Sequence, residues 1–127
     1  MLVAVAVASA VALFLPTVMN GAAGGVAPNE AVLLINREKA VLIDVCEPHE
    51  FAQGHAVGSK NIPLAQLEAE LPSVVKNKSV PVILVCQAGS RASRAAAQAK
   101  KLGYERAQAL AGGLKAWREA SLPTEKA

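Results

Sequence analysis

The chain has few of the residues that metal centres, disulfide scaffolds and nucleic-acid interfaces require. Its 127 residues include two cysteines and two histidines, with no repeated pair at the spacing of a zinc site. We therefore predict no metal ligands and no disulfide framework. Only four aromatic residues occur, and the lysines are scattered at a net charge of +3, so nucleic acid is not an expected partner.

Charged residues are also missing from the first part of the chain, where none precedes Glu30. Residues 1–19 form an almost uninterrupted apolar run, close to the roughly 17 to 25 residues that a membrane-spanning helix needs. A signal peptide is one alternative, because Ala8-Ser9-Ala10 offers the small residues of a cleavage site. However, no basic residues precede the run. A buried core helix is another, but the run has no polar face.

We favour a transmembrane anchor at 1–19, followed by a flexible glycine-containing linker at 20–27 and a domain at 28–127. All lysines and arginines follow the apolar run. The positive-inside rule therefore predicts a protein anchored in the inner or plasma membrane through residues 1–19, with its catalytic domain in the cytoplasm.

Short runs of apolar, β-branched residues alternate with helical patterns along the domain. Strands are expected at 41–45, at 80–85 and, more weakly, at 107–110. The expected helices are one capped by Asn29, one at 47–51, one at 64–71 ending before Pro72, one from Arg91 to a stop at Gly103, and one after Gly112-Gly113; 58–63 is expected to be extended or loop. This alternation predicts an α/β domain with a small, mainly parallel sheet flanked by helices.

Cys86 ends the second of these strands, where ligands bind in parallel sheets. A lone cysteine is most often a buried small apolar residue. Here, however, a glycine-containing loop follows it and Arg91 opens a helix, whose positive end favours a thiolate and can bind an anion. We predict that Cys86 is a catalytic nucleophile. The predicted substrate-binding residues are those of the loop: Gln87, Ala88, Gly89, Ser90 and Arg91.

Other polar residues have two interpretations each. Arg91 either attracts an anionic donor or braces the loop through a carboxylate. Asp44, at the end of the neighbouring strand, either fixes the loop or caps the next helix. Arg94, one turn after Arg91, either faces an anion or is solvated. For His55, Asn61 and Trp117 we expect structural roles.

The loop length separates two chemistries. Four residues lie between Cys86 and Arg91, whereas a tyrosine-phosphatase-type loop has five, enough to surround a phosphate. The shorter loop suits a smaller group, such as the terminal sulfur of a persulfide.

Four segments in order resemble motifs of the single-domain rhodaneses, which are thiosulfate and persulfide sulfurtransferases. The resemblance covers roughly residues 28–123, and a membrane-anchored bacterial subgroup has a similar amino-terminal hydrophobic helix. The segments are Cys86-Gln-Ala-Gly-Ser-Arg91 (the active-site loop), Leu42-Ile-Asp-Val-Cys-Glu-Pro-His-Glu-Phe51, Gly54-His-Ala-Val-Gly-Ser-Lys-Asn-Ile-Pro63 and Ala111-Gly-Gly-Leu-Lys-Ala-Trp117.

The resemblance implies a cycle without a metal or organic cofactor. Cys86 takes a sulfane sulfur from thiosulfate or a persulfide, and the amides of Gln87 to Arg91 hold the resulting persulfide. A thiol or cyanide then removes the outer sulfur. The expected partners are thus a small sulfur donor and a thiol acceptor. Alternatives are a non-enzymatic sulfur carrier that serves a docked acceptor protein and, less favoured, a cysteine-dependent phosphatase or arsenate reductase.

One position departs from the family pattern, because Cys46 stands where an arginine is usual. We favour a thiol packed as a small apolar group. The alternative is that Cys46 attacks oxidised or persulfidated Cys86 and forms an intramolecular disulfide.

Overall fold

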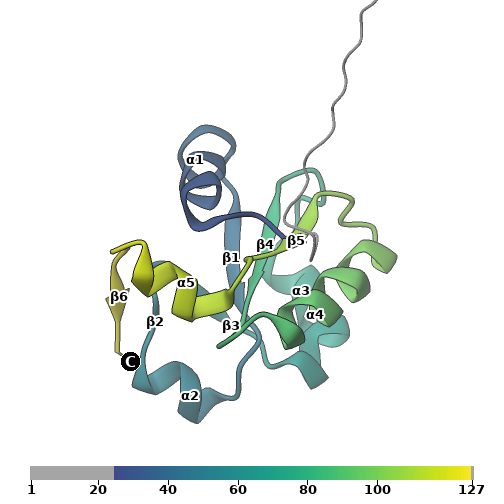
Figure 1. Cartoon of the computed structure of the whole chain (residues 1–127). Helices are drawn as coiled ribbons and strands as arrows, with labels where there is room; N and C mark the ends of the chain where they lie inside the picture. Colours follow the sequence, from purple (N-terminus) through teal and green to yellow (C-terminus); the bar gives the residue numbers. More distant parts are fainter. Residues whose placement is uncertain (1–24, 127) are drawn as a thin grey trace, which may run out of the picture.

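The computed structural model describes residues 25–126, which form a parallel sheet with helices on both faces (Figure 1). The sheet order is β3-β1-β4-β5, and all three pairings are parallel. The strands are β1 (Val41–Asp44), β3 (Lys60–Asn61), β4 (Val82–Val85) and β5 (Ala107–Ala109). The predicted α/β fold is therefore confirmed, with strands one or two residues shorter than expected.

The helices divide into two layers. One face of the sheet is covered by α1 (Pro28–Glu38) and α5 (Gly113–Glu119). The other face is covered by α3 (Leu67–Val74) and α4 (Ser90–Lys101), as Figure 1 shows. Side chains of β4 alternate between the layers: Leu84 packs in the cluster with α3 and α4, and Ile83 and Val85 pack in the cluster with α1 and α5. A strand buried on both faces accounts for the uninterrupted apolar run in the sequence.

Smaller elements close the ends of the fold. They are α2 (Pro48–Gln53), the 3-10 turn η3 (Leu64–Gln66), and an antiparallel pair of two-residue strands, β2 (His55–Ala56) and β6 (Thr124–Glu125). Trp117 is buried, and its indole N–H donates to the carbonyl of Pro123 at 2.8 Å. The expected structural role of Trp117 is thus what the fold shows.

Two helix ends differ from the sequence-based prediction. Ala27, not Asn29, is the N-cap of α1, since Pro28 occupies the first turn and the Glu30 carboxylate accepts the Ala27 N–H at 3.2 Å. Helix α3 does not end before Pro72 but continues to Val74. Proline removes one hydrogen bond there, and the burial of Leu67 and Leu71 on one face of α3 offsets that loss.

The amino-terminal segment enters beside β5. Val26 is buried, its N–H donates to the Ala109 carbonyl, and its own carbonyl accepts the Ala111 N–H, both at 2.8 Å. No helix between residues 25 and 126 is long and apolar enough to cross a membrane. The predicted anchor at 1–19 lies outside the described residues.

Candidate functional site

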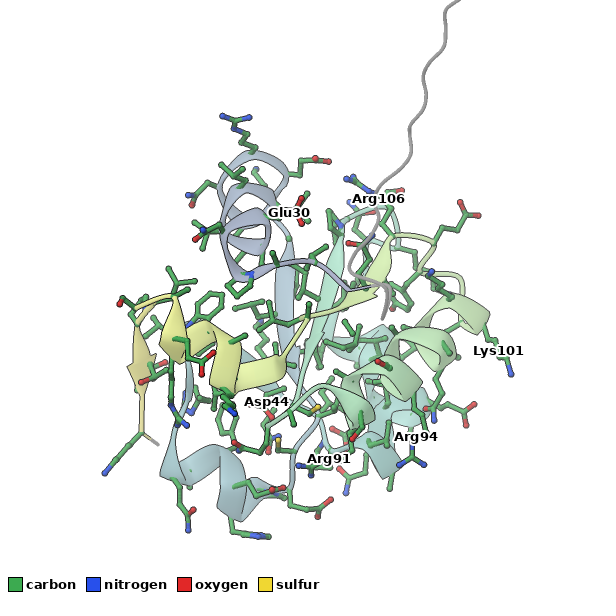
Figure 2. All side chains as sticks on the ribbon, in the orientation of Figure 1. Glu30, Asp44, Arg91, Arg94, Lys101 and Arg106 are labelled. Carbon is green, nitrogen blue, oxygen red and sulfur yellow. The ribbon has the colours of Figure 1, made fainter. Side chains whose placement is uncertain are left out.

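Asp44 and Cys86 come together because their strands pair in register. Asp44 of β1 is opposite Val85 of β4, and Cys86 follows directly. Figure 2 shows Asp44 and Arg91 at the same end of the sheet, where the loop 86–89 leads into α4. This is the carboxyl edge of a parallel sheet, the usual place for a ligand site.

Two backbone amides point at the Cys86 sulfur. The Gly89 N–H donates to Sγ at 2.9 Å and the Ala92 N–H donates to it at 3.3 Å. Gly89 is the N-cap of α4 with φ of 115°, a conformation that favours glycine. Cys86 is only 1 % exposed, so these amides and the positive end of α4 are the polar groups that face its sulfur and can stabilise negative charge there.

Of the loop amides predicted to hold a persulfide, those of Gln87 to Arg91, the Gly89 amide donates to Sγ, and the Ala92 amide, which lies outside that range, donates as well. Ala92 is the third residue of α4, and the first four N–H groups of any helix lack partners within that helix. That general rule could have identified Ala92 as a donor. Its side chain is apolar and gives no other signal.

The first turn of helix α5 is hydrogen-bonded to the backbone of the loop. The Leu114 N–H donates to the Cys86 carbonyl at 2.8 Å, and the Lys115 N–H donates to the Gln87 carbonyl at 3.3 Å. Gly113 allows this approach: it has φ of 63°, and a Cβ there would lie 2.5 Å from the Cys86 carbonyl oxygen. The Gly112-Gly113 pair therefore serves the loop as well as starting a helix.

Arg91 is held by a carboxylate that is not among the predicted site residues. Its guanidinium donates to Glu50 of α2 at 2.8 and 3.2 Å, and the two side chains are 31 and 26 % exposed. This hydrogen bonding lowers the pKa of Glu50 to about 2 and raises the pKa of Arg91. Of the two roles considered for Arg91, the contact corresponds to the brace.

Asp44 does not cap α2, so that interpretation is wrong. The N-cap of α2 is Glu47, whose own N–H donates to Glu50 at 2.9 Å. The buried Asp44 carboxylate instead accepts the Cys46 N–H at 2.9 Å, which fixes the turn after β1. Burial raises the pKa of Asp44, and the Cys46 N–H partly opposes that increase.

Asn61 and His55 support the same region. The Asn61 amide donates to the carbonyls of Asp44 and Cys46 at 3.0 and 2.9 Å. The His55 ring stacks on Phe51 and lies 3.3 Å from the carboxylate of Glu125. Asn61 and His55 therefore have structural roles, as expected.

With this geometry established, comparison with known proteins identifies the family. Residues 27–120 match the rhodanese-like domain. The chain belongs to this family. It is 46 % identical over 79 residues to the uncharacterized protein YqhL of Bacillus subtilis, a match covering 62 % of this chain and 61 % of YqhL.

Two named sulfurtransferases are also similar to this rhodanese-like domain. Thiosulfate sulfurtransferase GlpE of Pseudomonas putida is 29 % identical over 102 residues, covering 79 % of this chain and 88 % of GlpE. The human single-domain sulfurtransferase TSTD1 aligns with a TM-score of 0.66 at 29 % identity, covering 76 % of this chain and 96 % of TSTD1. The match thus covers nearly all of these two proteins but only about three fifths of YqhL.

The two remaining candidate residues, Cys46 and Arg94, differ in burial: Cys46 is buried beside the loop, and Arg94 is exposed. Cys46 is buried, and its Sγ lies 3.9 Å from the Gln87 side-chain nitrogen, a donor to it. Burial, followed by the charge of Asp44, raises the pKa of Cys46 to about 12. Both cysteines are free thiols. Arg94 is exposed and points away from the loop in Figure 2, with no ion pair to any residue between 25 and 126.

Proposed function

We propose that this rhodanese-like domain is a sulfurtransferase that moves a sulfane sulfur through a persulfide on Cys86. The donor is thiosulfate or a persulfide, and the acceptor is a thiol or cyanide. The observation that carries the proposal is the pair of N–H groups, from Gly89 and Ala92, directed at Sγ. The sulfurtransferase names of similar proteins support the same reaction class.

The reaction has two displacements at sulfur. The Cys86 thiolate attacks the outer sulfur of the donor, the S–S bond of the donor breaks, and the leaving group takes the electron pair; from thiosulfate it is sulfite. A nucleophilic acceptor then attacks the outer sulfur of the Cys86 persulfide, and the Cys86 thiolate leaves. In both steps negative charge at Sγ is stabilised by the two amides and by the amino terminus of α4.

Intact-mass spectrometry after exposure to thiosulfate, or to an organic persulfide, tests the proposal. We expect the native domain and a Cys46→Ser variant to gain the mass of one sulfur atom, and a Cys86→Ser variant to gain none. Cys46→Ser is the matched control, since it removes the other thiol. A gain of sulfur by the Cys86→Ser variant would contradict the proposal. So would the failure of the native domain and the Cys46→Ser variant to gain sulfur from either donor.

The second half-reaction separates an enzyme from a sulfur carrier that serves a docked protein. As an enzyme, the loaded domain should lose its extra sulfur to cyanide or a small thiol within the mixing time of the assay. Retention of sulfur until an acceptor protein is added would identify the carrier alternative.

We also propose that residues 1–19 anchor the protein in a membrane with this domain on the cytoplasmic side. The support is the uncharged apolar run and the lysines and arginines that follow it. The full chain should stay with membranes during alkaline extraction. Its domain should be digested by protease only when the cytoplasmic face is accessible; release of the chain into the soluble fraction would refute the anchor.

A further inference from the structure

The charges beside the Cys86 thiol suggest which donors the site favours. Within residues 25–126, Arg91 is the one lysine or arginine whose side chain forms an ion pair at the site, and its charge is matched by that of Glu50 at 2.8 and 3.2 Å. With its pKa at about 2, Glu50 is a carboxylate at neutral pH. The Arg91–Glu50 pair therefore has no net charge with which to attract an anion.

Position 46, where an arginine is usual in the rhodanese pattern, could have supplied a second cation, but it is occupied by Cys46. Its Sγ lies against Gln87, the residue after Cys86. The guanidinium of Arg91 is close enough to both thiols that negative charge on either raises its pKa, which places Cys46, Cys86 and Arg91 in one group. Since the pKa of Cys46 is about 12, this thiol is neutral at physiological pH. The side chain of Lys115 is exposed, where solvent and salt screen its charge.

Building on the proposed function, we infer that this site selects sulfur donors with at most one negative charge, such as organic hydropersulfides, over the thiosulfate dianion. Glu50 and Cys46 are the residues that determine this selectivity. Thiosulfate would bring two negative charges to a thiolate without a free cation to offset them, and such repulsion is substantial where water is partly excluded.

The reaction with a hydropersulfide, R–S–SH, is balanced without any further reactant. The Cys86 thiolate attacks the outer sulfur and forms a new S–S bond. The donor S–S bond breaks, and its electron pair leaves with RS⁻. The proton of the outer sulfur passes to RS⁻, which yields RSH and the Cys86 persulfide anion, so that one thiol replaces another with no net oxidation.

Two matched donors isolate the effect of charge. Thiosulfate carries two negative charges; methanethiosulfonate, in which a methyl group replaces one oxygen, carries one, and both transfer their outer sulfur. Single-turnover loading of Cys86 is followed by intact mass in rapid-quench samples. For each thiol we take the ratio of its loading rate with thiosulfate to its loading rate with methanethiosulfonate. The ratio for free cysteine gives the intrinsic reactivity of the two donors. We expect the ratio for Cys86 in the native protein to lie below the ratio for free cysteine.

Variants then change one charge at a time. Cys46→Arg and Glu50→Gln should each raise the ratio about tenfold at low ionic strength, equivalent to about 1.4 kcal/mol, and less at high salt. Glutamine keeps an oxygen that can accept the Glu47 N–H of α2. Cys46→Ser is the neutral control. Glu38→Gln is the carboxylate control, because Glu38 pairs with Arg106 before the amino ends of β1 and β5, at the opposite edge of the sheet.

Failure of the charge selectivity and failure of the proposed function give different results. A ratio that stays at the native value in both Cys46→Arg and Glu50→Gln, or a native ratio at or above that of free cysteine, would overturn the charge selectivity while leaving a working sulfurtransferase. Failure of Cys86 to load from either donor would overturn the proposed function, and the selectivity with it.

Discussion

A methyl group at Gly113 should displace the loop that presents Cys86. Gly113 has φ of 63°, and its added Cβ would lie 2.5 Å from the Cys86 carbonyl oxygen and 2.7 Å from that of Gln87. Both neighbours are backbone atoms, so the contact cannot be relieved by a side-chain rotation. Either α5 or the loop must move.

Three costs combine in Gly113→Ala. The left-handed conformation costs a residue with a Cβ about 1 kcal/mol, and forced contacts in a packed site cost about 1 to 3 kcal/mol. Movement of the loop weakens the hydrogen bond from Leu114 N–H to the Cys86 carbonyl, worth about 1 kcal/mol. We expect a total loss of about 3 to 5 kcal/mol in the free energy of unfolding.

Urea unfolding followed by Trp117 fluorescence measures this loss, since Trp117 is the single tryptophan and lies buried in α5. Gly58→Ala is the matched control: Gly58 has φ of 86° with nothing within 4 Å of an added Cβ. That variant should lose only the conformational cost, about 1 kcal/mol. Equal losses in the two variants would refute the argument that Gly113 is required by the loop.

Three other perturbations test separate contacts. Because the folded-state pKa of Glu50 is lowered from 4.5 to about 2, its pair with Arg91 stabilises the fold fully above about pH 4.5, and this contribution is lost as the pH falls toward 2. The free energy of unfolding should therefore fall more steeply between pH 4.5 and about 2 in the native domain than in the Glu50→Gln variant. Parallel curves for the two proteins would contradict this. Tyr104→Phe removes a buried hydrogen bond of 2.6 Å to the Val75 carbonyl and should cost about 1 to 3 kcal/mol in urea unfolding without slowing sulfur loading; slower loading would place Tyr104 in the site. With a pKa of about 12, Cys46 is almost entirely a thiol at mildly alkaline pH, so peptide mapping should find iodoacetamide on Cys86 well before Cys46; faster labelling of Cys46 would show that its thiol is not held as described.

The sheet and the position of Cys86 were predictable because both rest on local patterns. Runs of apolar, β-branched residues identify β1 and β4, and Cys86 and Arg91 flank a short glycine-containing loop within ten residues of β4. Binding at the carboxyl edge then follows from the parallel arrangement. The two-residue strands β2 and β6 are too short to produce a periodic signal in the sequence, so they were not predictable.

The contacts that complete the site depend on how distant segments pack. Glu50 is 41 residues from Arg91, and no local pattern distinguishes it from the nearby Glu47. Asp44 precedes α2 and resembles a helix cap in sequence, yet the chain turns so that its carboxylate accepts the Cys46 N–H instead. The Ala92 amide follows from its place in the first turn of α4, whereas the Leu114 amide reaches the Cys86 carbonyl only through the packing of α5 against the loop.

The central claim is that sulfur passes through Cys86, and a single-turnover transfer with labelled sulfur tests it most directly. Thiosulfate or methanethiosulfonate labelled in the outer sulfur is mixed with excess protein, unreacted donor is removed, and cyanide is added. We expect the label to appear first on the peptide containing Cys86 and then, at the rate of its loss from that peptide, in thiocyanate. Label that reaches thiocyanate without ever residing on Cys86, or that remains unreacted with the native protein, would contradict the account.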